Sequence, residues 1–332
     1  MSYSIGSLFS GTGILDVAIQ DVFDSHAVWH SQYEPPDKKG RPDVHQYAAK
    51  ILARHWPTTP NLGDITAIDW QAVLAEHGPV DIVSGGFPCG DVSVAGLQAG
   101  ITPHTRSGLW AHMAAAIDAL NPQLVVIENV EGLLHAPAHR GLGPTDPDVE
   151  AAGDNALRAL GAVLGDLANR RLDAEWLSID ASAVGALHRR RRIIVLAWPA
   201  APHPSRPRLE IRQVQPDGHQ RKTPQRSRHE LAGPPVGGAW APAVTHWART
   251  LGRPAPQPAD ARGEINPAFS EWLMGFPDGW VTDTPAPPGM SQSALRDAQL
   301  HAIGNSVCRQ QIAAGIRTCY ARATAGDMAA AA

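Results

Sequence analysis

The first 198 residues alternate between short apolar segments and segments whose apolar residues recur at helical spacing, and this alternation constrains the fold most strongly. Helical spacing is clear over residues 13–23 and 44–55. The strand-like segments are residues 4–10, 27–33, 80–84, 124–129, 173–179 and 192–198. Strands that alternate with helices build βαβ units, so the sequence predicts an α/β fold with a doubly wound, mostly parallel sheet.

Residues 199–262 break this alternation, because they are rich in Pro and Arg and poor in periodic apolar residues. We expect a small irregular lobe or a partly disordered insert there. Regular structure is expected to resume over residues 266–275 and in a long helix from about residue 305 to 324. The predicted parts are a first domain (1–198), the irregular region (199–262), a segment returning to the first domain (263–325) and a disordered tail (326–332).

Charge is unevenly distributed along the chain, whose net charge is −4. Residues 200–262 hold ten Lys and Arg against four Asp and Glu, a net charge of +6, which leaves −10 for the rest. A basic segment in an acidic chain suits a phosphate-bearing partner. A solvated Arg-rich loop explains the same charge equally well.

Glycines and acidic residues follow the first strands and indicate an adenosine-type ligand. The first strand ends in FSGTG (residues 9–13), where glycines let a ligand approach the backbone and a helix N-terminus offers N–H groups. Glu34 ends the second strand, where an acidic residue can bind ribose hydroxyls. Asp64 marks a third candidate strand end, where an Asp can accept a hydrogen bond from an adenine amino group. The turn lacks the third glycine of GxGxxG and a Walker lysine, which disfavours nicotinamide cofactors and ATP and leaves S-adenosylmethionine as the best candidate.

A cysteine stands where the third strand ends, in the stretch GGFPCGDVSVAG (residues 85–96). The thiol of Cys89, in a loop beside a methyl donor, is a candidate nucleophile. The next apolar strand ends in Glu128, a carboxyl group that is costly at a buried position unless it has a role or a partner. Arg190 and Arg192 precede the last strand and point the same way as alternate residues, although the Arg run alone also fits a solvated charge cluster. We therefore expect a thiol, a carboxyl group and two guanidinium groups at one sheet edge.

Other classes of site are disfavoured by the composition. Three cysteines without a CxxC pair argue against a disulfide framework and a structural zinc site, and for a reducing, intracellular setting. The histidine pairs at residues 26/30 and 135/139 have no third ligand in register, so no metal site is predicted. No apolar run is long enough to span a membrane, and no signal-peptide pattern begins the chain.

The motifs that hold these residues resemble, in order, those of the DNA (cytosine-5)-methyltransferases. FSGTG is similar to the first motif of that family, PCGDVSVAG (residues 88–96) to the Pro-Cys loop with its nucleophile, and ENV (128–130) to its ENV triplet. HRRRR (188–192) resembles the QxRxR motif, and RSGL (106–109), NPAFSEWLMGFPDGW (266–280) and GNSV (304–307) resemble three further motifs. The resemblance covers about residues 4–198 and 263–320, and this conjunction of motifs is highly specific.

The resemblance implies a Rossmann-like class I methyltransferase fold, with residues 199–262 as a small target-recognition lobe. It implies methyl transfer from S-adenosylmethionine to C5 of a cytosine flipped out of double-stranded DNA. Cys89 would then add to cytosine C6, Glu128 would contact N3, Arg192 would hold O2, and Arg190 would support the loop and the phosphate backbone. The implied cofactor residues are Phe9, Gly11, Gly13, Glu34, Asp64, Ile65, Leu109 and Asn305. We expect DNA contacts from Ser93, Asn129, Arg190, Arg221, Lys222, Arg226 and Arg228.

Three residues depart from the family pattern, and one of them is Ile14, which replaces a common glycine. Gly90 stands where a polar residue usually follows the cysteine, and His188 stands where Gln is usual. A catalytically silent DNA-binding protein with this fold and the same chemistry on tRNA are the alternative interpretations. We expect a cytoplasmic monomer of bacterial or phage origin, with a cognate restriction endonuclease as a candidate partner.

Overall fold

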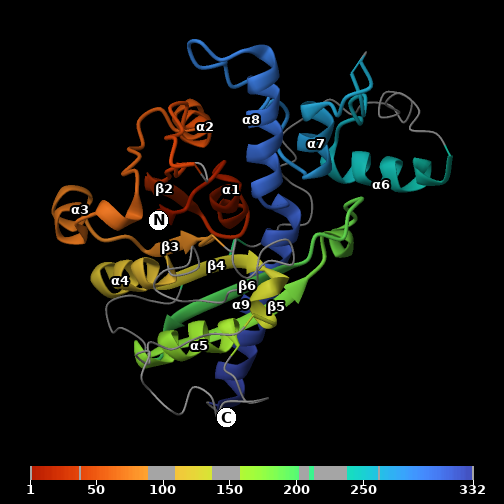
Figure 1. The fold of residues 1–332 in the computed structure, drawn as a ribbon. Helices are drawn as coiled ribbons and strands as arrows, with labels where there is room; N and C mark the ends of the chain where they lie inside the picture. Colours follow the sequence, from red (N-terminus) through yellow and green to blue (C-terminus); the bar gives the residue numbers. More distant parts are fainter. Residues whose placement is uncertain are drawn as a thin grey trace, which may run out of the picture.

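A six-stranded sheet with helices on both faces forms the centre of the molecule (Figure 1). The computed structural model describes residues 2–36, 39–88, 109–136, 158–201, 209–212, 238–260 and 262–330. The strands are β1 (Tyr3–Leu8), β2 (Ser25–Ser31), β3 (Ile82–Gly85), β4 (Leu124–Val130), β5 (Leu172–Ile179) and β6 (Arg192–Pro199). Their order across the sheet is β2-β1-β3-β4-β6-β5.

The sheet is parallel over four strands and antiparallel at one side. β1 pairs in parallel with β2 and β3, and β3 with β4, whereas β6 is antiparallel to both β4 and β5. The predicted α/β fold with a mostly parallel sheet is therefore confirmed. Because β6 runs against β4, the first residue of β6 lies at the carboxyl end of β4, where Arg192 pairs with Val130.

Helices cover the two faces of the sheet and build two separate cores. The helices of one face are α3 (Trp70–His77), α4 (Trp110–Leu120) and α5 (Ala159–Asn169), and those of the other are α1 (Ile14–Gln20), α2 (Tyr47–His55), α8 (Gln292–Asn305) and α9 (Arg309–Ala330). Alternate residues of β4 serve the two cores: Val125 and Ile127 face the first, and Val126 faces the second. Both faces are thus buried, as expected of a doubly wound sheet.

A third apolar cluster supports the lobe that includes α6 (Ala241–Leu251) and α7 (Pro267–Leu273), which lie side by side in Figure 1. Trp247 and Trp272 are fully buried in this cluster, together with Cys308. The expectation of an irregular region over 199–262 is wrong for α6, because this helix has an apolar stripe that packs on α7. The many Pro and Arg residues of the 199–262 region led us to overlook the helical spacing of its apolar residues.

The C-terminal helices also differ from the expectation. A helix was predicted from about residue 305 to 324, but α8 ends at Asn305 and α9 begins at Arg309. The chain bends between them because Ser306 is extended (ψ −170°) and ends α8. α9 then continues to Ala330, past residue 325, where we expected order to end.

Candidate active site at the carboxyl end of the sheet

The turn predicted to bind the cofactor, residues 9–13 and here called the cofactor turn, joins β1 to α1 through three left-handed backbone positions. Phe9, Gly11 and Gly13 have φ values of 51°, 56° and 78°. Gly13 is the N-cap of α1, and no side chain caps this end of the helix. The first N–H groups of a helix also have no partner within the helix. Any other residue at Gly13 would place a Cβ 2.5 Å from the Trp56 ring. The turn therefore presents backbone polar groups at the edge of the sheet, the arrangement that a small polar ligand requires.

Side chains from distant segments fix the cofactor turn. The N–H of Gly11 donates to Gln32 Oε1 over 2.7 Å, just after β2. The hydroxyls of Thr12 and Ser306 lie 2.7 Å apart, which ties the turn to the segment between α8 and α9. The turn is thus held by residues 21 and 294 positions away in the sequence.

A buried polar pair lies beneath this turn and was not identified from the sequence. Asp16 of α1 is fully buried and accepts hydrogen bonds of 2.7 Å from the hydroxyls of Ser7 and Ser84. His30 of β2 is also fully buried, with its Nε2 3.8 Å from the Asp16 carboxylate. Burial raises the pKa of Asp16 to about 6 and lowers the pKa of His30 to about 4. The only signal in the sequence was a carboxylate amid the apolar residues of α1.

Both predicted cofactor carboxylates have partners within the protein. Glu34 Oε2 accepts from the N–H of Ala48 at the start of α2 (3.3 Å), and burial followed by the charge of Asp43 raises the pKa of Glu34. Asp64 does not end a strand, contrary to the prediction. It caps the short 3-10 helix η1 (Ile65–Ala67) by accepting from the N–H of Thr66 (3.0 Å). A hydrogen bond of 2.9 Å from the Ser31 hydroxyl to the carbonyl of residue 63 joins this segment to the end of β2.

The remaining predicted cofactor residues lie around the same edge. Phe9 and Leu109 are half-buried and pack on the same apolar core, and Ile65 is buried in it. Asn305 ends α8, and its Nδ2 lies 2.8 Å from the Nε2 of His301. Asn305 precedes Ser306, which bonds to the cofactor turn, so the end of α8 adjoins this edge.

An ion pair occupies the neighbouring end of β4. Arg192 Nε lies 2.7 Å from Glu128 Oε1, and the two side chains are only 12% and 13% exposed. Burial raises the pKa of Glu128, and the charges of Arg192 and Arg190 oppose that rise. The carboxyl group is therefore set to keep its proton to a higher pH than an ordinary Glu, while a guanidinium group stays beside it.

Gly86 makes room for this carboxyl group directly after β3. A Cβ at residue 86 would lie 2.9 Å from Glu128 Oε2 and 3.3 Å from the Glu128 carbonyl. Asn129, which is buried, donates from Nδ2 to the carbonyl of Phe87 over 3.3 Å and accepts from the N–H of Val130. The end of β4 thus orders the backbone that leads from β3 to residue 88.

Arg190 holds the start of β6 to the end of α8. Its guanidinium donates to the carbonyl of Gly304 over 2.8 Å and to the carbonyl of Ser306. Burial, and then the charge of Arg192, lowers the pKa of Arg190 to about 10. The structure therefore brings Glu128, Arg190 and Arg192 together, as predicted, and engages Arg190 with backbone carbonyls.

Several predicted residues lie outside the described part of the chain. These are Cys89, Gly90, Ser93, Arg221, Lys222, Arg226 and Arg228. His188 is described, and its Nε2 lies 3.2 Å from the carbonyl of Leu273 in the lobe. Among the described residues, no group of His, Cys, Asp and Glu is arranged to hold a metal ion, and no helix is long and apolar enough to cross a membrane.

Comparison with known proteins places this site in a family context. A family model described as C-5 cytosine-specific DNA methylase matches residues 3–231, more than half of the chain. Type II methyltransferase M.AluI of Cellulosimicrobium cellulans is 38% identical over 101 residues, which are 30% of this chain and 19% of that protein. A DNA N-6-adenine-methyltransferase of Escherichia phage P1 is 26% identical over 223 residues, 58% of this chain and 28% of that protein. The chain thus spans less than a third of the length of these two relatives.

A solved structure supports the fold independently. The DNMT2 of Spodoptera frugiperda superposes with a TM-score of 0.55 and 15% sequence identity, covering 96% of this chain and all of that one. At this level of identity the likeness concerns the fold alone.

Proposed function

Because the chain belongs to the C-5 cytosine-specific DNA methylase family, we propose that it transfers a methyl group from S-adenosylmethionine to C5 of cytosine in DNA. The observation that carries this proposal is the Glu128–Arg192 pair, nearly buried at the end of β4 and packed against Gly86. Pro88 and Cys89 follow Gly86 within three residues. We propose that Glu128, Arg192 and the thiol of Cys89, three residues after Gly86, act together at this edge of the sheet.

The described residues fit an adenosine-type cofactor. The cofactor turn offers N–H groups without a side-chain cap at α1, and Glu34 supplies a carboxylate near the same edge. The turn has no lysine for a phosphate group. We propose that Phe9, Gly11, Gly13, Glu34, Asp64, Ile65, Leu109 and Asn305 form the cofactor site. When bound there, S-adenosylmethionine supplies an activated methyl group.

Cys89, Glu128 and Arg192 have different roles in the proposed reaction. Cys89, as a thiolate, forms a bond to cytosine C6, and the electron pair displaced from the C5–C6 double bond makes C5 nucleophilic. Protonated Glu128 donates to N3 of the ring, and Arg192 holds O2, so both stabilise the charge that develops on the base. C5 forms a bond to the methyl group as the bond from that group to the sulfonium sulfur breaks, which leaves S-adenosylhomocysteine. The C5 proton then passes to solvent water, the C5–C6 double bond re-forms, and the bond between Sγ and C6 breaks to release the Cys89 thiolate.

Double-stranded DNA is the substrate that we propose, with the base turned out of the helix because C6 cannot be attacked inside the stack. The net charge of +6 over residues 200–262 supports a polyanionic partner, and phosphate contacts there position the chain without specifying a sequence. Ser93, Asn129, Arg190, Arg221, Lys222, Arg226 and Arg228 are the proposed DNA-contacting residues. Relatives named as type II methyltransferases support a cognate restriction endonuclease as a partner. We further propose that the protein acts as a monomer.

Methyl transfer from radiolabelled S-adenosylmethionine tests the proposal. We expect label on C5 of cytosine in duplex DNA, no turnover with Cys89→Ser, and retained S-adenosylhomocysteine binding by that variant. Duplex DNA containing 5-fluorocytosine should trap a covalent adduct with the wild type. Label on adenine N6, transfer to tRNA in preference to DNA, or full activity of Cys89→Ser would refute the proposed substrate or mechanism.

A further inference from the structure

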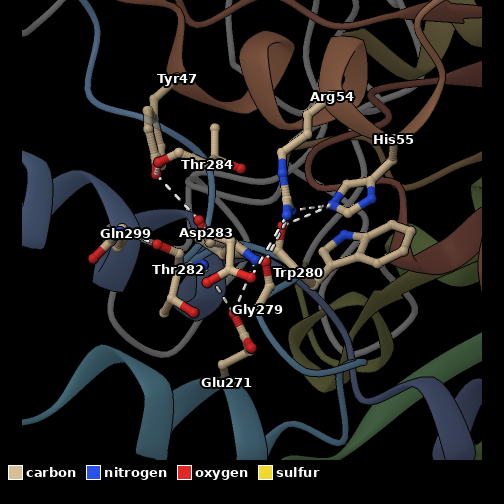
Figure 2. Close-up of polar contacts among 11 residues, drawn as sticks. Tyr47, Arg54, His55, Glu271, Gly279, Trp280, Thr282, Asp283, Thr284 and Gln299 are labelled. Carbon is tan, nitrogen blue, oxygen red and sulfur yellow. Dashed lines mark hydrogen bonds and ion pairs between the residues drawn. The ribbon is translucent and has the colours of Figure 1, made fainter.

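A turn near the C-terminal end, residues 277–284, is fastened to α2 by three side chains. Figure 2 shows Tyr47, Arg54 and His55 converging on this turn. The Tyr47 hydroxyl donates to the carbonyls of residues 281 (3.2 Å) and 284 (3.1 Å), and Arg54 Nη1 donates to the carbonyl of residue 279 (2.9 Å). The turn is thus fixed to a helix more than 200 residues earlier in the chain.

The same turn is fastened to α7 and α8 on its other sides. Glu271 Oε2 accepts from the N–H groups of Val281 (2.8 Å) and Thr282 (3.0 Å). Gln299 Nε2 donates to the carbonyl of Thr282 over 3.2 Å (Figure 2). Glu271 is almost fully buried, and it is adjacent to Trp272 in the lobe core. Helices from both ends of the chain therefore determine where residues 277–284 lie.

Trp280 extends from this turn to the cofactor turn. Its ring stacks on the His55 ring with centroids 3.5 Å apart and planes 4° apart, and its carbonyl lies 2.8 Å from His55 Nε2. The indole Nε1–H of Trp280 donates to the carbonyl of Thr12 over 2.8 Å. The Trp56 ring packs edge-on against Trp280, 5.5 Å between centroids, and also fills the space beside Gly13.

Anchoring the Thr12 carbonyl restrains the peptide between Thr12 and Gly13. The N–H of that peptide points away from the carbonyl, as a trans peptide requires, and donates to the carbonyl of Ser10 over 2.8 Å. Trp280 therefore holds one end of the peptide whose other end closes the tight turn. The following residues begin α1, whose N-terminus has no side-chain cap.

We propose that Trp280 is a positioning residue for cofactor binding, acting through the Thr12 carbonyl. This inference rests on the proposed function, because it takes the turn at residues 9–13 as the cofactor site. Trp280 keeps the turn in its binding conformation without touching the cofactor. Its loss then raises the dissociation constant of the cofactor more than it lowers the rate of the chemical step.

The test replaces the indole N–H and keeps an aromatic ring. In Trp280→Phe, the stack on His55 persists but the hydrogen bond to Thr12 is lost. We expect the dissociation constant of S-adenosylhomocysteine, measured by calorimetry, to rise about three- to tenfold, the range of one lost hydrogen bond. The KM for S-adenosylmethionine should rise more than kcat falls. Trp176→Phe, on β5 and 38% exposed, is the matched control and should bind like the wild type.

A second variant isolates the hydrogen bond if Trp280→Phe folds poorly. Incorporation of benzothienylalanine at residue 280 replaces the indole N–H by sulfur in a ring of the same shape, and the same weakening is expected. The inference is overturned if both variants bind S-adenosylhomocysteine within about twofold of the wild type, or if kcat alone falls. Absence of binding by the wild type would instead refute the cofactor site itself.

Discussion

The buried pair of Asp16 and His30 makes a quantitative prediction about stability and pH. Burial raises the pKa of Asp16 from its ordinary 3.8 to about 6, so its contribution to stability falls as the pH rises through this interval. Burial lowers the pKa of His30 from its ordinary 6.5 to about 4, so its contribution is lost as the pH falls through nearly the same interval. The two contributions to the free energy of unfolding therefore change with pH in opposite directions.

Their magnitudes nearly cancel. At about 1.4 kcal/mol per pKa unit, each shift corresponds to about 3 kcal/mol over its interval. On folding, a proton in effect leaves His30 and is taken up by Asp16, so the pair exchanges almost no protons with the solvent between pH 4 and 6. The pair therefore adds almost no pH dependence to the free energy of unfolding in the wild type.

Single substitutions should reveal the pH dependence that each residue of the pair contributes to the free energy of unfolding. Relative to the wild type, Asp16→Asn should gain about 3 kcal/mol of unfolding free energy as the pH rises from about 4 to about 6.5, because only the His30 contribution remains. His30→Gln should lose about the same amount over that range. Urea unfolding followed by circular dichroism at several pH values measures both differences, and the comparison with the wild type removes the contribution of all other titrating groups.

The double variant, Asp16→Asn with His30→Gln, is the internal control. Its difference from the wild type should be nearly independent of pH, whatever its overall loss of stability. If both single variants instead follow the wild-type curve in parallel, within about 1 kcal/mol, the reasoning about the pair is wrong.

Three further predictions concern the proposed catalytic residues at the end of β4 and the attachment of the C-terminal helix α9. Gly86→Ala places a Cβ 2.9 Å from Glu128 Oε2, so the rate of methyl transfer should fall at least about tenfold. Calorimetry should show that the variant still binds S-adenosylhomocysteine. Unchanged activity would mean that the carboxylate can move aside. Turnover should decline as the pH rises through the raised pKa of Glu128, because the proton donated to the base is then lost, and a pH–rate profile of Glu128→Gln should lack that decline. Arg309→Gln removes two hydrogen bonds of 2.6 Å to Asp21 that join α9 to α1, so urea unfolding should show a loss of about 1 kcal/mol. No loss would show that this partly buried pair contributes nothing to stability.

The parts of the fold predicted from the sequence are those specified by local pattern. The run Leu124–Val130 combines five buried residues with Glu128 and Val130, which are half-buried. Its nearly continuous apolar character identified β4 and directed attention to Glu128 at its end. The turn at residues 9–13 was recognisable because Gly11 and Gly13 adopt left-handed backbone angles that other residues rarely accept.

The parts that were missed depend on partners far away in the sequence. α8 has few apolar residues and buries Gln299 beside Ala302 and Ile303, so its pattern does not resemble an amphipathic helix. Asp64 follows a segment that looks like a strand end, but the chain there makes a single bridge to β2 and then a 3-10 turn. Neither outcome can be read from local periodicity, because tertiary contacts decide both.

The contact between Thr12 and Ser306 has a consequence for the order of events during synthesis. These residues are 294 positions apart, and the Thr12 carbonyl also accepts a hydrogen bond from Trp280, which is synthesised almost as late. A nascent chain that has already formed β1 to β4 has Gln32 beside this turn, but it still lacks Trp280 and Ser306, the two partners of Thr12, while α8 is inside the ribosome. Affinity for the proposed cofactor should therefore appear late and abruptly in translation, and the turn at residues 9–13 should be among the last parts of this fold to reach its final conformation.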